Sequence, residues 1–166
     1  PYAQRKAYDM LIQAESGLAS VTGSPDEPSR VGISIVDITT GHHAYEAILE
    51  ALIRRANTGK GADIRISMFD VMAEYMSVPM MQGRAGYPQP RIGLRHTALA
   101  PYGVFTTKDE QPVLISIQNE REWRALCEKV LENPDLARNP RFASNSDRVG
   151  HREECDVLIQ GWFSTQ

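Results

Sequence analysis

The sequence is poor in the features that mark disulfide-bonded, zinc-binding and membrane proteins. It has only two cysteines, Cys127 and Cys155, and no CxxC pair, which argues against a disulfide framework or a structural zinc site. No apolar run is long enough to cross a bilayer, and the sequence shows no signal-peptide pattern. We therefore expect a cytoplasmic protein with no metal site and no contact with a membrane.

Charge and short motifs exclude further classes. The formal net charge is -3 at pH 7, so the chain lacks the basic stripe of a nucleic-acid-binding surface. There is no HExxH motif, no phosphate-binding loop and no GxSxG elbow. His42 and His43 are adjacent on a predicted helix, where side chains point about 100° apart and make a poor metal pair. The chemistry must therefore come from other side chains.

The stretch 36–68 organises the rest of the chain. Asp37 closely follows the apolar run 31–36, which is typical of an extended segment. Apolar residues then recur at helical spacing, and Gly59 suits the left-handed turn that ends a helix. Alternating apolar residues over 64–68 predict a strand. The sequence thus places one carboxylate where an extended run meets a helix N-terminus, with a strand returning behind it.

Asp37 has two interpretations. An aspartate just before a helix is most often a cap that accepts backbone N–H bonds, which stabilises the helix by about 1 kcal/mol. The alternative is a nucleophilic or basic carboxylate, because helix N–H groups also stabilise negative charge in a transition state. Spacing alone does not separate the two interpretations.

The remaining segments predict a two-part chain. Helices are expected over residues 5–20 and 69–81, and the methionines of the second helix are typical of an adaptable core. Glycines and prolines over 82–90 break the pattern, so we place a domain boundary between 82 and 83.

The second part is predicted to contain two strands and two helices, over residues 102–107, 112–117, 119–131 and 147–162. Residues 107–111 suit a polar hairpin connection. Asn119 is a suitable helix cap, and Glu122 follows at the spacing of a capping box. We expect Trp123, Leu126, Cys127 and Val130 to face inward.

Short motifs run in a fixed order along nearly the whole chain. In the first part they include Pro1-Tyr2-Ala3, Lys6-Ala7-Tyr8-Asp9, Asp37-Ile38-Thr39-Thr40-Gly41, Thr58-Gly59-Lys60-Gly61 and Ser67-Met68-Phe69-Asp70. In the second part they include Arg95-His96, Ala100-Pro101-Tyr102-Gly103-Val104-Phe105 and Asn139-Pro140-Arg141-Phe142-Ala143. In order and spacing these motifs resemble the class III CoA-transferase family, also called the CaiB/BaiF family.

The resemblance implies an α/β fold. Residues 1–82 would form part of a large, Rossmann-like, CoA-binding domain that carries the catalytic aspartate, and residues 83–166 an incomplete, smaller α+β domain. Members of the family are considerably longer and form homodimers whose chains interlock like links. Since the sequence opens at Pro1 inside a family motif, we expect an internal fragment or the ordered remnant of a longer protein.

The resemblance also implies a chemistry. An aspartate at the position of Asp37 attacks an acyl-CoA thioester, giving an aspartyl anhydride and then an aspartyl-CoA thioester, from which an acceptor carboxylic acid takes CoA. A carboxylate suits this role because it divides the exchange into covalent steps. Coenzyme A enters as a substrate, with no metal or redox cofactor. Lys6, Tyr8 and Met68 match CoA-binding positions, although such a lysine is usually solvated and such a methionine usually belongs to the core.

Other interpretations stay open. Some relatives are acyl-CoA racemases that use an Asp–His pair, in which Asp9 would be the base and its histidine partner would precede Pro1. We favour transfer because Asp37 stands in the motif 37–41 as transferases have it.

Arg95 and His96 are secondary substrate-site candidates by resemblance, although a loop histidine bonded to backbone is the more usual role. A non-catalytic interaction domain is a further alternative, and the acceptor acid is not readable from the sequence.

Overall fold

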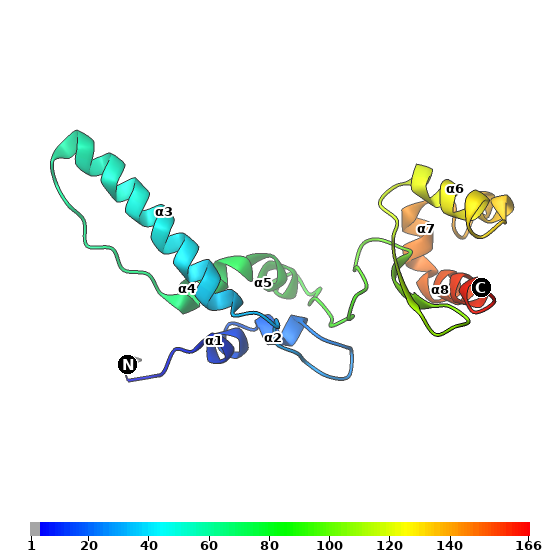
Figure 1. Ribbon diagram of the computed structural model, residues 1–166, viewed down its shortest axis with the longest axis horizontal. Helices are drawn as coiled ribbons and strands as arrows, with labels where there is room; N and C mark the ends of the chain where they lie inside the picture. Colours follow the sequence, from blue (N-terminus) through cyan, green and yellow to red (C-terminus); the bar gives the residue numbers. More distant parts are fainter. Residues whose placement is uncertain (1–3) are drawn as a thin grey trace. The chain divides into compact units, whose positions relative to one another are not determined.

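The computed structural model describes residues 4–166 and divides into two compact units, Pro1–Gly93 and Leu94–Gln166 (Figure 1). The division falls later than the expected boundary between 82 and 83, and the role of 1–82 as part of a CoA-binding domain stays a prediction. The motif at residues 1–3 lies outside the described residues. Helices and a small sheet occur in one chain, which confirms the predicted mixed class. Within residues 4–166 no helix is both long and apolar enough to span a membrane.

The described part of the first unit is built from five helices. They are α1 (Asp9–Glu15), α2 (Leu18–Val21), α3 (Ile35–Thr58), α4 (Met68–Tyr75) and α5 (Ser77–Arg84). The single helix expected over 5–20 is wrong, because Gly17 takes a left-handed conformation with φ 86° between α1 and α2. The helix expected over 69–81 is divided at Met76. Pro79 explains this break, because its ring would clash with the carbonyl group four residues earlier in a continuous helix.

Helix α3 is the long element of the first unit, and its end is set by local chemistry. Gly59 follows its last residue with φ 68°, and the Gly59 N–H donates to the Arg55 carbonyl oxygen at 2.8 Å. A left-handed glycine at this position satisfies an orphan carbonyl group of the last turn without a Cβ penalty. The predicted helix stop at Gly59 is therefore confirmed.

The extended run expected over 31–36 and the strand expected over 64–68 are both wrong. Residues 31–34 form a bend, and Ile35 and Val36 already belong to α3. Residues 60–67 form an irregular link that returns along α3 to α4 (Figure 1). A strand needs a neighbour to satisfy its N–H and C=O groups. In the described part of the first unit, the only such pairing is the isolated bridge between Gly23 and Pro28.

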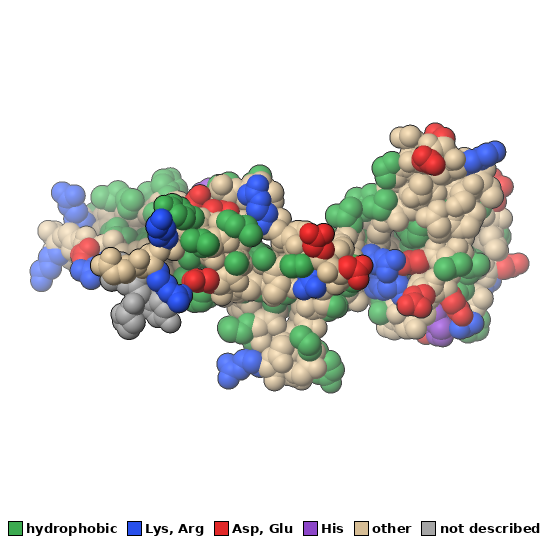
Figure 2. Space-filling view, turned by 90° about the horizontal axis from the view of Figure 1, so that it is seen from below, with side chains coloured by type: hydrophobic (Ala, Val, Ile, Leu, Met, Phe, Trp, Pro, Cys, Tyr) green, Lys and Arg blue, Asp and Glu red, His purple; other side chains and the backbone are tan. Residues whose placement is uncertain are grey.

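The first unit has a small core where α1, α3 and α4 meet. Ile12, Val36 and Met72 are buried together, and Met68 packs against them. The apolar residues farther along α3 remain exposed, for example Ile48, Leu49, Leu52 and Ile53. Hydrophobic side chains accordingly gather on the surface of this unit in the space-filling view (Figure 2). Burial therefore fixes the first turns of α3, which carry Asp37, and not its far end.

The second unit contains a two-stranded antiparallel sheet. Strands β1 (Tyr102–Thr106) and β2 (Pro112–Ser116) pair in a register that sets Tyr102 opposite Ser116. Both predicted strands are confirmed to within one residue. The helical elements that follow are α6 (Glu120–Lys129), the 3-10 helix η1 (Pro134–Arg138), α7 (Asn145–Gly150) and α8 (Arg152–Phe163). The helix expected over 147–162 is thus two helices, divided at His151.

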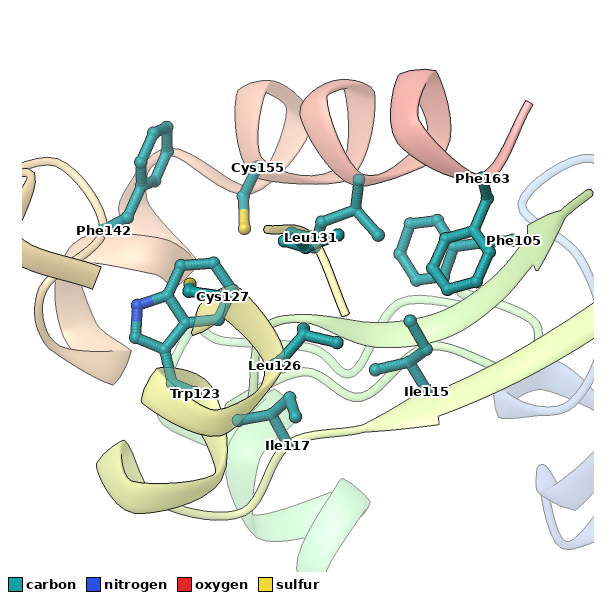
Figure 3. Packing of buried hydrophobic residues seen from close by; sticks show 11 residues of the cluster. Phe105, Ile115, Ile117, Trp123, Leu126, Cys127, Leu131, Phe142, Cys155 and Phe163 are labelled. Atoms are coloured by element: carbon teal, nitrogen blue, oxygen red, sulfur yellow. The ribbon is translucent and has the colours of Figure 1, made fainter. Parts of the chain in front are cut away.

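One hydrophobic cluster fills the second unit between the sheet, α6 and α8 (Figure 3). Trp123, Leu126 and Cys127 of α6 are buried as predicted, while Val130 is only partly buried. Cys155 of α8 is also buried, and both cysteines are free thiols. The predicted Asn119 cap is confirmed, since its side chain accepts a hydrogen bond from the Glu122 N–H at 3.0 Å.

Candidate active site

Asp37 lies in the first turn of α3 and is exposed to solvent. It is not the helix cap, so the capping interpretation of this residue is wrong. Ser34 occupies the cap position without a capping side-chain bond. Among residues 4–166, no group donates a hydrogen bond to the Asp37 carboxylate. The carboxylate therefore stands beside the positive end of the helix dipole with its oxygens free to react.

The cap of α3 comes instead from Asp9 on α1. Asp9 Oδ1 accepts a hydrogen bond from the Val36 N–H at 2.8 Å, and Asp9 Oδ2 accepts one from Gln13 Nε2 at 2.7 Å. Gln13 is fully buried, and its Oε1 accepts from the Val31 N–H at 2.8 Å. Both oxygens of Asp9 are thus engaged by the protein itself.

A cavity of about 850 Å³ lies in the first unit beside these elements. Its walls include two of the predicted CoA-binding residues, Lys6 and Met68, together with Ile12. Met68 and Ile12 also pack around Val36, the residue before Asp37. The cavity therefore shares Ile12 and Met68 with the small core that holds Val36. Asp37 itself is not among the described residues that line the cavity.

The polar groups at this cavity are mixed in sign. The Arg5 guanidinium pairs with Glu15 at 3.1 Å, with both side chains at least half exposed. Lys6 is exposed and has no hydrogen-bond or ion-pair partner among residues 4–166. The third predicted CoA-binding residue, Tyr8, is 62% exposed and is not a described lining residue. The structure thus brings Lys6 and Met68 to one cavity and leaves Tyr8 at the surface.

Arg95 and His96 belong to the second unit, whereas Asp37 belongs to the first. His96 Nδ1 accepts a hydrogen bond from the Ala98 N–H at 3.0 Å, as in the loop interpretation of this residue. Arg95 Nη2 lies 3.9 Å from Asp156 Oδ2, and both residues line a small cavity of about 290 Å³. Burial raises the pKa of the Asp156 carboxyl, and the neighbouring Arg95 opposes that shift.

His43 connects α3 to α4. Its Nδ1 lies 3.0 Å from the Thr39 carbonyl oxygen, and its Nε2 lies 3.3 Å from Glu74 Oε2. The hydrogen bond to the Thr39 carbonyl group is the largest cause that raises the pKa of His43 above 6.5, and Glu74 raises it further. Across residues 4–166, no group of three or more His, Cys, Asp or Glu side chains has the geometry to hold a metal ion.

Sequence reasoning missed the structural role of Gln13 and the partner of Asp9. The spacing of Asp9 and Gln13 is the one available signal, because residues four apart on a helix form side-chain hydrogen bonds. Their bonds to Val31 and Val36 cross 18 and 27 residues of sequence, and no local pattern predicts such contacts.

Comparison with known proteins gives a consistent result. A sequence model of the family described as CoA-transferase family III matches residues 1–166. The chain is 38% identical over 169 residues to the acetyl-CoA:oxalate CoA-transferase of Acetobacter aceti, covering 100% of this chain and 43% of that protein. It is 34% identical over 161 residues to the succinate–glutarate CoA-transferase of Agrobacterium fabrum, covering 96% of this chain and 40% of that protein.

The fold is also similar to that of solved structures. A CaiB/BaiF family protein from Brucella suis matches with a TM-score of 0.81 and 35% identity, over 100% of this chain and 44% of that one. This chain therefore spans less than half the length of the relatives that it matches.

Proposed function

Since the chain belongs to CoA-transferase family III, we propose that the polypeptide that contains it transfers coenzyme A from an acyl-CoA thioester to a carboxylic acid. The observation that carries this proposal is the state of Asp37. Its carboxylate is exposed in the first turn of α3, and no group among residues 4–166 donates a hydrogen bond to it. A nucleophile needs this accessibility.

In the proposed reaction Asp37 acts as a covalent nucleophile. A carboxylate oxygen attacks the acyl carbonyl carbon, the C–S bond breaks, and CoA leaves as a thiolate with an aspartyl anhydride behind it. The thiolate then attacks the aspartyl carbonyl carbon, which releases the first acid and forms an aspartyl-CoA thioester. The acceptor acid repeats these two steps in reverse and leaves as its CoA thioester. The N-terminal position of Asp37 on α3 stabilises negative charge that develops there.

Coenzyme A is the shared substrate, and the residues of the 850 Å³ cavity suit part of it. Lys6 offers an exposed ammonium group to a phosphate or carbonyl oxygen. Met68 offers a flexible apolar surface to the pantetheine arm or the acyl group. Tyr8 is exposed close to Lys6 in the chain and is the third proposed contact. The names of the two relatives suggest short dicarboxylates, such as oxalate, succinate and glutarate, as the first acceptors to assay.

Racemisation by Asp9 is not favoured, because both oxygens of that carboxylate are engaged by Val36 and Gln13.

Three further expectations stay predictions. They are the substrate-site roles of Arg95 and His96, the interlocked homodimer and the cytoplasmic location. Light scattering on the complete polypeptide tests the dimer, and a monomer at high concentration would contradict it.

The test of the proposal is an exchange assay on the complete polypeptide that contains this sequence. Asp37→Asn removes the nucleophile and keeps the size of the side chain, so CoA exchange should be lost while the circular dichroism spectrum is unchanged. Asp63→Asn is the matched control, because Asp63 is 71% exposed and pairs only with Arg65 on the surface. Exchange by Asp37→Asn at the rate of the control would refute the assignment.

A further inference from the structure

The bend that leads into α3 is held at both of its ends by one neighbouring helix. At one end, the Val31 N–H donates to Gln13 Oε1 at 2.8 Å, and at the other the Val36 N–H donates to Asp9 Oδ1 at 2.8 Å. Gln13 Nε2 joins the two contacts by donating to Asp9 Oδ2 at 2.7 Å. We propose that Asp9 and Gln13 form a positioning pair that fixes the first turn of α3 and thereby the carboxylate of Asp37.

The first N–H groups of a helix have no partner within the helix and need one from outside. Ser34, at the cap position, does not supply it with its side chain. The Asp9 carboxylate does, and a charged acceptor makes this hydrogen bond stronger than a neutral one while also favouring the positive helix end. The first turn of α3 therefore depends on a residue from a different helix.

Burial makes the hydrogen bonds of this pair costly to lose. Gln13 and Val36 are both 0% exposed, so no water replaces a lost hydrogen bond at low cost. Val36 also packs against Ile12 and Met72, which fixes its side chain. Asp37, the next residue, points to solvent from this anchored position. Holding Val36 thus holds the backbone from which the reacting carboxylate projects.

This inference rests on the proposed role of Asp37 and predicts a particular kinetic defect. In the complete polypeptide, Asp9→Ala should lower kcat by about 10- to 100-fold, since small displacements of a reacting group have effects of this size. KM for acyl-CoA should change little, because Asp9 contacts the helix and not the cavity. Asp9→Asn keeps an oxygen acceptor for the Val36 N–H but sets an amide N–H against Gln13 Nε2, so it should recover part of the activity.

Amide hydrogen exchange supplies a second measurement. The Val36 N–H should exchange faster in Asp9→Ala than in the unchanged protein, and Asp9→Asn should lie between them. Gln13→Ala should show the same kinetic defect, because it removes the bond that orients the Asp9 carboxylate. Asp63→Asn, on the surface of the same unit, should match the unchanged protein in both measurements.

Several results would overturn the inference. Activity of Asp9→Ala within about twofold of the unchanged protein would exclude a positioning role. Equal loss in Asp9→Asn and Asp9→Ala, together with loss of substrate α-hydrogen exchange with deuterated water, would make Asp9 a proton-transfer group. If Asp9→Ala does not fold, the activity of Asp9→Asn and the exchange rate of its Val36 N–H test the positioning role instead. Retained exchange in Asp37→Asn is a separate outcome, because it refutes the nucleophile and not the hydrogen-bonded pair.

Discussion

Gly41 follows Asp37 by one turn of α3, so bare backbone lies next to the carboxylate on the same face of the helix. A Cβ atom added at Gly41 would meet nothing within 4 Å. Glycine inside a helix is less stable than alanine by about 1 kcal/mol. Packing within residues 4–166 therefore does not require a glycine at this position.

Gly41→Ala separates stability from activity. The 166-residue chain should gain about 0.5–1 kcal/mol of unfolding free energy, measured by urea denaturation followed by circular dichroism. In the complete polypeptide the same change should slow CoA exchange, because the thioester must approach the helix beside Asp37. Gly161→Ala is the control, since Gly161 also lies within a helix with no atom near an added Cβ. Unchanged exchange in Gly41→Ala would show that the substrate does not approach this face.

The parts of the fold that the sequence predicted well are those set by local chemistry. Asn119 and Glu122 define the start of α6 within a few residues, and Gly59 defines the end of α3. The break at Pro79 follows from the same kind of local rule and was open to prediction. The strand expected over 64–68 failed because a period-two pattern does not show whether a neighbouring strand exists.

The site was predictable only in part. The motif around Asp37 marked the candidate nucleophile, while the capping role, which was one of two interpretations of Asp37, belongs to Asp9. The contact from Asp9 to Val36 depends on how α1 packs against α3. Tertiary packing of this kind is not encoded in the spacing of either segment.

His43 makes the contact between α3 and α4 sensitive to pH. Its pKa is raised by the Thr39 carbonyl group first and then by Glu74. A raised pKa in the folded state gives a stabilisation that is fully present below the unfolded pKa of 6.5 and is lost as the pH rises through the folded value. An NMR titration of the His43 ring should therefore give a pKa above 6.5, and Glu74→Gln should lower it. A value at or below 6.5 in the unchanged protein would contradict this.

Arg148 is a buried arginine that links several segments of the second unit by hydrogen bonds. It is 1% exposed and donates to the carbonyl oxygens of Ala100 at 2.6 Å and Phe142 at 2.9 Å and to Glu120 at 2.8 Å. Its guanidinium carbon also lies 4.9 Å from the centre of the Trp123 ring. Removing it leaves buried carbonyl oxygens without partners.

Arg148→Met should therefore lower the free energy of unfolding of the second unit by about 2–4 kcal/mol. Both tryptophans, Trp123 and Trp162, lie in this unit, so tryptophan fluorescence, excited selectively over tyrosine during urea denaturation, reports on it alone. Arg138→Met is the control, because Arg138 is 80% exposed and its surface pair with Asp135 contributes little. Equal stability of the two variants would mean that the buried network does not support the unit.

The most direct test of the central claim is to trap the covalent intermediate on Asp37. The complete polypeptide is incubated with acyl-CoA and quenched with hydroxylamine, which converts an aspartyl anhydride or thioester into a hydroxamate. Trypsin cleaves after Arg30 and Arg54, so Asp37 falls in the peptide 31–54. Tandem mass spectrometry should locate one hydroxamate, on Asp37 and not on Glu46 or Glu50, and none in Asp37→Asn. Active exchange with no adduct on Asp37 would contradict the account.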